Sequence, residues 1–188
     1  MALLGATYLC LVIGLYGIGF WMPQLLKGFG LSNLGVGLLA AVPYAAAAVG
    51  MVVAGWHSDR TGERIRHVAL PLFVAALAFL WSARAGDLPV AVLTLSLAAL
   101  GIYAAIGTFW SLPAALLTGS GAAGGFALIN SIGNCGGFIG PVVIGGLRGE
   151  TGGFAAPLLF LAASLGLAGV LALGFGRLHA TALRRRGG

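Results

Sequence analysis

The sequence predicts an all-α polytopic membrane protein with six transmembrane helices, and three observations lead to this prediction. Hydrophobic residues make up 60% of the 188 residues and charged residues only 7%, whereas a soluble domain carries about 25% charged residues. The apolar residues form six long runs, rather than the short alternating segments of a membrane β-barrel. All Asp, Glu, Lys and Arg residues lie between or beyond these runs, so no carboxylate is expected inside the bilayer.

Each run is long enough for a membrane helix, which needs about 20 apolar residues to cross the hydrocarbon. The expected spans cover residues 3–26, 34–56, 67–84, 89–117, 123–147 and 155–175. They form one six-span domain over residues 1–176, followed by a basic cytoplasmic tail over residues 177–188. Pro43 and Pro113 fall inside their spans, and we expect each of them to kink or locally open its helix.

The distribution of Lys and Arg predicts the orientation of the spans. Basic residues are more frequent in the cytoplasmic loops of membrane proteins than in the loops on the other side. The loop over residues 118–125 carries no charge and is assigned to the cytoplasm only because the spans alternate in direction. Both termini are therefore expected in the cytoplasm, with the chain in the cytoplasmic (inner) membrane. One side holds Arg60, Arg64, Arg66, Arg177, Arg184, Arg185 and Arg186, and the other holds Lys27, Arg84 and Arg148.

Several function classes are not expected. The net charge of +6 is spread over loops rather than gathered on one soluble face, so no nucleic-acid partner is expected. Cys10 and Cys135 lie in apolar runs, where a free cysteine behaves as a small hydrophobe, and no disulfide is implied. The sequence has no nucleophile with a base, no metal-ligand cluster and no phosphate loop. We therefore expect neither an enzyme nor a bound cofactor or metal.

A hydrophilic segment over Gly55–His67 separates the second and third spans and places seven ionisable residues in eleven positions. One interpretation is that these charges only orient the chain in the membrane. Another is that Asp59 and Arg60 cap helix ends and pair with a neighbouring helix around a tight turn at Gly62. In that case the segment is a breakable latch between two packed states.

The order of residues in this segment, Gly55-x-x-Ser58-Asp59-Arg60-x-Gly62-x-Arg64, resembles the loop motif of the major facilitator superfamily. The segments Tyr16–Gln24 and Ala127–Pro141 are similar to motifs of its anion:cation symporter family, which includes tartrate-, phthalate- and galactonate-type organic-anion transporters. The chain departs from the loop motif at Glu63 and Ile65, where basic residues are common in the superfamily.

The resemblance covers essentially the whole chain and implies that its six spans correspond to the seventh to twelfth spans of a twelve-span carrier. Such carriers work by rocking two halves, each built from 3+3 inverted repeats, around a central site. The implied substrate is a small organic anion that moves with a proton or another cation. The main cationic ligand and the proton-titrating carboxylates are then expected in an N-terminal half. Gly55, Asp59, Arg60, Gly62 and Arg64 are expected to form a conformational-switch loop.

Polar residues inside the spans are candidates for substrate contact. Asn130 and Asn134 are four residues apart and share one helix face. An amide pair can donate to a carboxylate and accept from a hydroxyl, which suits a hydroxy acid, or it can hold two helices together. Thr108 and Ser111 form a polar stripe on the fourth span, close to the backbone that Pro113 frees.

Aromatic residues inside the spans are the other candidates. Trp110 shares a stripe with Tyr103 and either contacts the substrate or anchors the helix at the lipid interface. Tyr16 lies mid-span in the first-span motif, where a phenol normally needs a partner, and is expected to line a cavity. Tyr44, beside Pro43, is a weaker candidate.

Three hypotheses about function remain open. The chain is a C-terminal half-carrier from a split or truncated gene that needs a partner half. Alternatively, it is a six-span module that dimerises with itself. The third hypothesis is an inactive truncated remnant that folds in the membrane. The expected partners are the lipid bilayer, an organic anion with its coupling cation, and either an N-terminal half or a second copy.

Overall fold

The computed structural model describes residues 1–117 and 119–186, and the side chains of all of these except residues 120 and 182–186. All regular elements in these residues are helical. Thr118 of the uncharged loop and Gly187 and Gly188 of the expected tail lie outside the described residues. The elements are α1 (Ala2–Lys27), α2 (Asn33–Thr61), α3 (Ile65–Ser82), α4 (Leu88–Phe109), α5 (Ser111–Ala114), η1 (Gly119–Gly121), α6 (Ala122–Asn134), α7 (Gly136–Thr151) and α8 (Ala155–Arg186).

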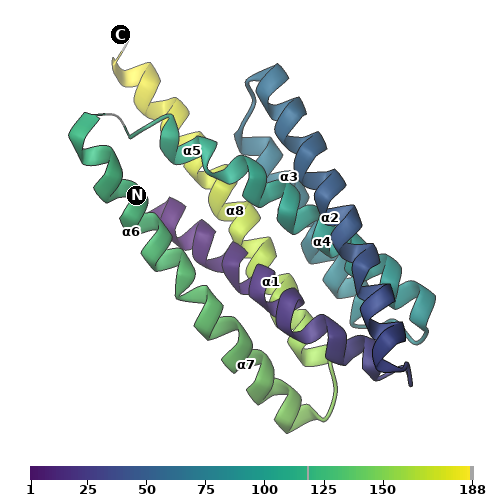
Figure 1. Cartoon of the computed structure of the whole chain (residues 1–188). Coiled ribbons are helices and arrows are strands. Elements are labelled where there is room, and N and C mark those ends of the chain that lie inside the picture. Colours follow the sequence, from purple (N-terminus) through teal and green to yellow (C-terminus); the bar gives the residue numbers. More distant parts are fainter. Residues whose placement is uncertain (118, 187–188) are drawn as a thin grey trace.

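These helices form six segments that are long and apolar enough to cross a membrane, which confirms the predicted number of spans. Helix α4 continues into α5 as one such segment, and α6 continues into α7 as another. The start of α1 and the end of α8 lie at the same end of the bundle, as an even number of spans requires (Figure 1). Lys27, Arg84 and Arg148 follow or end helices at the opposite end.

The two prolines inside the spans have different effects. Helix α4 ends at Phe109, four residues before Pro113. Proline has no N–H to donate to the carbonyl of Phe109, and its ring collides with that carbonyl. The expected opening of the fourth span is therefore present. Helix α2, in contrast, runs through Pro43 as one helix of 29 residues, so the local opening expected there does not break the helix. Pro43 is buried, and α2 packs along α4, which supports the helix where one hydrogen bond is missing.

Two polar segments at the end of the bundle where α1 begins are more helical than expected. Helix α2 continues to Thr61 and α3 begins at Ile65, so only three residues of the hydrophilic segment form the turn. Gly62 ends α2 in the left-handed conformation (φ +69°) and donates its N–H to the carbonyl of Ser58. Likewise, α8 runs to Arg186 because no Gly or Pro follows Gly176 before that residue, and residues 177–186 extend the last helix.

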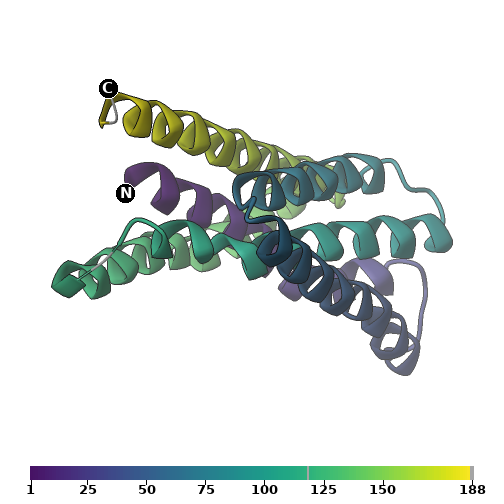
Figure 2. The same cartoon turned by 90° about the horizontal axis from the view of Figure 1, so that it is seen from above.

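The helices pack as two interleaved, inverted repeats of three. Helices α2, α3 and α4 lie together on one side of the bundle, and α1, α6, α7 and α8 lie on the other (Figure 2). Helix α2 packs on α4 as α6 and α7 pack on α1, and α3 packs on α4 as α8 packs on α1. In this comparison α1 is equivalent to α4 and α3 is equivalent to α8. The α1–α4 contact and the α3–α8 contact therefore each join two equivalent helices. Equivalent helices run in opposite directions because three spans separate them.

Close backbone approach at two glycines holds the central helices. A Cβ atom on Gly101 of α4 would lie 2.3 Å from the carbonyl oxygen of Pro71 in α3. A Cβ atom on Gly136 of α7 would lie 2.5 Å from the carbonyl oxygen of Leu9 in α1. No side chain fits in either place without moving a helix. Small residues at helix crossings permit this approach in membranes, where lipid tails remove the hydrophobic force between helices.

Gly101→Ala is therefore expected to lower the free energy of unfolding by about 1–3 kcal/mol, because the new methyl group forces α3 and α4 apart. Gly146→Ala is the matched control, since a Cβ atom there meets nothing within 4 Å. The control should be neutral or stabilising by up to about 1 kcal/mol, because alanine favours helix more than glycine does. Unfolding of the detergent-purified variants measures both values, and equal stabilities would contradict the close contact.

Candidate functional site

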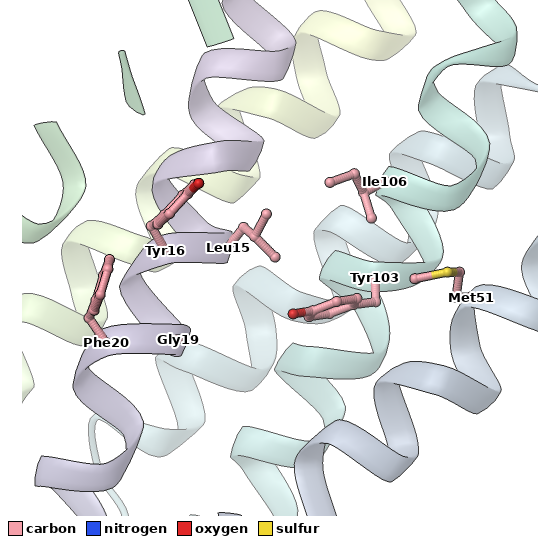
Figure 3. A pocket seen from close by; sticks show the side chains of 7 residues that line it. All are labelled: Leu15, Tyr16, Gly19, Phe20, Met51, Tyr103 and Ile106. Atoms are coloured by element: carbon pink, nitrogen blue, oxygen red, sulfur yellow. The ribbon is translucent and has the colours of Figure 1, made fainter. Parts of the chain in front are cut away.

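An open pocket of about 510 Å³ lies between α1, α2 and α4 (Figure 3). Helices α1 and α4 occupy equivalent positions in the two repeats, so the pocket lies where the repeats meet. It is close to the middle of both spans, the depth at which carriers built from inverted repeats bind their substrates. We call it the mid-span pocket. Its lining residues are Leu15, Tyr16, Gly19, Phe20, Met51, Tyr103 and Ile106.

The mid-span pocket has an aromatic wall on each side. On α1, the rings of Tyr16 and Phe20 stack with their centroids 5.8 Å apart. On the opposite side, the phenol of Tyr103 points from α4 toward α1 (Figure 3). The ring of Tyr44 in α2 meets Tyr103 edge-on at 6.3 Å. The lining therefore offers apolar surface and phenol hydroxyls but no charged group, the usual composition of a small-molecule pocket with few polar groups.

The two candidate amides form a pair on the exposed side of α6. The Nδ2 atom of Asn134 donates to the Oδ1 atom of Asn130 at 2.9 Å and to its backbone carbonyl at 2.8 Å. This arrangement leaves the NH₂ group of Asn130 and the Oδ1 atom of Asn134 available for other partners. The amide pair does not line the mid-span pocket. It lies one turn before Gly137, which packs on the ring of Tyr16.

Thr108 and Ser111 lie away from the mid-span pocket, in contrast to the expected polar lining. Thr108 is buried, and its hydroxyl lies 3.0 Å from the carbonyl of His67 and 3.1 Å from that of Ala104, so it joins α4 to α3. Ser111 donates to the carbonyl of Thr108 at 2.6 Å, within the break that Pro113 causes. Both hydroxyls thus satisfy backbone carbonyls.

Trp110 is half-buried in an aromatic cluster at the same break. Its ring lies 4.8 Å from that of Tyr8 and 5.9 Å from that of Phe126, so it connects α1, the end of α4 and α6. It does not line the mid-span pocket. Of the seven candidate substrate contacts, only Tyr16 lines this pocket. Sequence reasoning left Tyr103, Phe20 and Met51 out of the candidate contacts, although the mid-span depth of Tyr103 was a usable signal.

The turn between α2 and α3 is organised around Ser58, which is buried. Its hydroxyl donates to the carbonyl of Glu63 at 2.9 Å and accepts from Arg64 at 3.1 Å. Arg64 also forms an ion pair with Asp59. Asp59 therefore pairs with the residue that directly precedes α3, whereas Arg60 lies over the ring of Trp56 in its own helix, at 5.4 Å. The expectation that Arg60 pairs with a neighbouring helix is not met.

A chain of three side chains also joins the two helices at this turn. The carboxylate of Glu63 accepts from the backbone N–H of Arg66 and so caps the start of α3. The same carboxylate lies 3.1 Å from Nδ1 of His67. The Nε2 atom of His67 lies 2.6 Å from Nδ1 of His57. If Nδ1 of His67 donates to Glu63, then His57 is the donor to His67.

The chain is similar in sequence to proteins that are named transporters. The chain matches no protein-family model. It is 40% identical over 183 residues to a putative tartrate transporter of Agrobacterium vitis, over 97% of this chain and 41% of that protein. It is 36% identical over 160 residues to a quinolone resistance transporter of Acinetobacter baumannii, over 85% of this chain and 37% of that protein. The inner membrane transport protein RhmT of Escherichia coli (strain K12) is 33% identical over 164 residues, 85% of this chain and 38% of RhmT.

The chain has the architecture of half of a major facilitator fold. It spans 37% to 41% of the length of these relatives and contains six candidate spans arranged as two inverted repeats. The α2–α3 turn of this chain lies at the end of the bundle where α1 begins and α8 ends (Figure 1).

The contacts in this turn differ in strength. The side chains of Arg64 and Asp59 are 33% and 73% exposed, and an exposed ion pair contributes about 0–1 kcal/mol. The buried hydroxyl of Ser58 bonds both the carbonyl of Glu63 and the side chain of Arg64. Removing this hydroxyl would break both hydrogen bonds and cost about 1–3 kcal/mol of stability. The turn is therefore held mainly by Ser58, while the ion pair of Asp59 can break at low cost.

Ser58→Ala is expected to lower the free energy of unfolding by about 1–3 kcal/mol, and Asp59→Asn by no more than about 1 kcal/mol. Ser96→Ala is the matched control, because Ser96 donates only to the carbonyl of Val92 in its own helix. It should change stability by less than about 0.5 kcal/mol. Thermal unfolding in detergent measures the three values, and an equal loss in Ser58→Ala and Ser96→Ala would refute the role of Ser58.

Proposed function

We propose that this chain is the C-terminal six-helix half of a major facilitator carrier of the anion:cation symporter type. It moves small organic anions, such as hydroxy or sugar acids, by alternating access together with a proton or another cation. The observation that carries this proposal is the open mid-span pocket, which helices of both repeats line. The name of the Agrobacterium vitis relatives, putative tartrate transporter, supports a hydroxy acid as the substrate.

A second six-helix half is proposed to cover the side of the bundle that α2, α6 and α7 form. Helices α2 and α6–α7 are the least buried spans. In the most apolar 18-residue stretch of each span, 22% of α2 and 28% of α6–α7 is buried, against 61% of α1. Lipid alone is a poor cover for this side, because Asn130, Ser131 and Asn134 are exposed on α6. Polar side chains in a membrane usually face a bundle interior or a water-filled cavity. A partner half therefore accounts for these residues better than lipid does.

The two halves would contribute different chemistry to the substrate site. This half supplies the phenols of Tyr16 and Tyr103 and the amide pair of Asn130 and Asn134, which suit hydroxyl and carboxylate oxygens. Trp110, Thr108 and Ser111 act through the helix break, which positions α4 and α6 around the site. The lining of the mid-span pocket includes no basic side chain. We propose that the cationic ligand and the proton-titrating group belong to the N-terminal half.

The α2–α3 turn is proposed to act as the conformational switch. Gly55, Asp59, Arg60, Gly62 and Arg64 form this turn and the helix that leads into it. The ion pair between Asp59 and Arg64 is weak enough to exchange partners when the halves rock. With the basic residues of this turn in the cytoplasm, both termini are cytoplasmic and the carrier lies in the inner membrane.

Proteoliposomes that contain this chain alone are expected to show no proton-driven uptake of tartrate or galactonate, since alternating access needs two halves that rock against each other. Uptake is expected when the chain is co-reconstituted with the N-terminal six-helix half of a tartrate transporter. That half alone is the control. Uptake by this chain alone at the rate of the pair would contradict the need for a partner and favour a self-assembled carrier.

Tyr103→Phe and Asn130→Ala should each weaken tartrate binding to the paired carrier by about 5- to 10-fold, the loss of one hydrogen bond. The matched control is Tyr8→Phe, because Tyr8 is buried against Phe109 and lies outside the mid-span pocket. Radioligand binding and the amount of membrane-inserted protein are measured together. If Asn130→Ala lowers insertion as much as binding, the amide serves only helix packing.

A further inference from the structure

A second pocket, of about 440 Å³, lies at the end of the bundle opposite to the termini. It is built where α1 and α7 end and α8 begins. Two basic side chains line it, Lys27 from α1 and Arg148 from α7, and the lining includes no acidic residue. We call it the cationic pocket. Its lining residues are Gln24, Lys27, Gly28, Arg148, Gly152 and Phe154.

Both cations are held in place by uncharged partners. Arg148 donates to the side-chain carbonyl of Gln24, and its guanidinium lies 4.5 Å from the ring centroid of Phe154 and 5.5 Å from that of Trp21. The Nζ atom of Lys27 donates to Oδ1 of Asn33 at 3.0 Å. Among the described side chains, those of residues 1–117, 119 and 121–181, the ion pairs found are those of the α2–α3 turn, at the other end of the bundle. These contacts position the two charges without neutralising them.

The helix dipoles around the cationic pocket do not neutralise the two charges either. Helices α1 and α7 end there, and each C-terminus carries about half a negative elementary charge. Helix α2 begins at Asn33, beside Lys27, and α8 begins directly after Phe154, and each N-terminus carries about half a positive charge. The four contributions cancel to a first approximation. The charged groups of the lining are therefore the two basic side chains, and Glu150, two residues after Arg148 in α7, lies outside the lining.

An adjoining pocket of about 250 Å³ shares Gly28 and Phe154 with the cationic pocket. Its side chains are apolar apart from Ser82, which is only 6% exposed, but backbone groups make about half of its surface polar. The hydroxyl of Ser82 is buried and has no hydrogen-bond partner among the described residues. An unpaired buried hydroxyl is costly, so it indicates a missing partner. The combined site suits a molecule with an oxyanion at one end and hydrogen-bonding groups at the other.

We propose that the cationic pocket binds an oxyanion through Lys27 and Arg148. The oxyanion is either the carboxylate of a dissolved organic acid or the phosphate of a lipid headgroup, which share this chemistry. In the proposed orientation the pocket faces outward, where it would concentrate anions at the mouth of the carrier. It is separate from the mid-span pocket, and its existence does not depend on the proposed function or on a partner half.

The test is thermal unfolding of the purified chain in neutral detergent with added tartrate, inorganic phosphate, phosphatidylglycerol or phosphatidylcholine. We expect the midpoint to rise in a saturable way with tartrate, phosphate or phosphatidylglycerol, since a ligand of the folded state stabilises it. Arg148→Gln and Lys27→Gln should each weaken the apparent affinity by about tenfold or more, the loss of one charge-assisted hydrogen bond. Arg148→Lys keeps the charge and serves if Arg148→Gln does not fold.

Arg84→Gln is the matched control. Arg84 lies at the same end of the bundle, is exposed and donates only to the carbonyl of Leu80, at 3.1 Å. It should retain the full response. A response to tartrate or phosphate supports the site with a dissolved anion as its ligand, and a response to phosphatidylglycerol alone supports it with a lipid headgroup. Either no response in the unmodified chain, or an equal loss in Arg84→Gln and the two pocket variants, would overturn the proposal.

Discussion

The arrangement of this bundle depends on close contact between helix backbones at glycine. Gly101 brings α4 against the carbonyl of Pro71 in α3, and Gly136 brings α7 against the carbonyl of Leu9 in α1. Lipid tails provide no hydrophobic force between helices, so such contacts determine which helices are neighbours. They place α1 and α4 in equivalent central positions. The mid-span pocket lies between these two helices for that reason.

The polar chemistry of the chain is divided by depth. At mid-span it offers only uncharged groups, the phenols of Tyr16 and Tyr103 and the amides of α6. Its charges lie at the two ends, around Ser58 at one and around Lys27 and Arg148 at the other. This division follows from the cost of placing a charge in hydrocarbon without a partner. It also explains why the proposed carrier needs a second half for the charged part of its substrate site.

The length and composition of the apolar runs were enough to predict six spans, because a span must satisfy its own backbone hydrogen bonds. The helix break before Pro113 followed from the chemistry of proline alone. At Pro43, where a kink or local opening was expected, α2 continues as one helix, and its packing on α4 supports it there. Thr108 was expected to line a cavity, but its hydroxyl lies against the carbonyl of His67, forty-one residues away. No local pattern reports a contact between residues so distant in the chain.

The sequence by itself determined the fold class, the alternation of the spans and the mid-span depth of Tyr16. These properties depend on hydropathy, helix length and residue type, which are read along a single helix. Only the tertiary structure decided that Tyr16 and Tyr103 face one pocket and that Asp59 pairs with Arg64. It alone placed Lys27 and Arg148 together, although 120 residues separate them. Which distant residues come together depends on how the helices rotate and cross. Side-chain packing decides this geometry, and a periodic sequence pattern does not encode it.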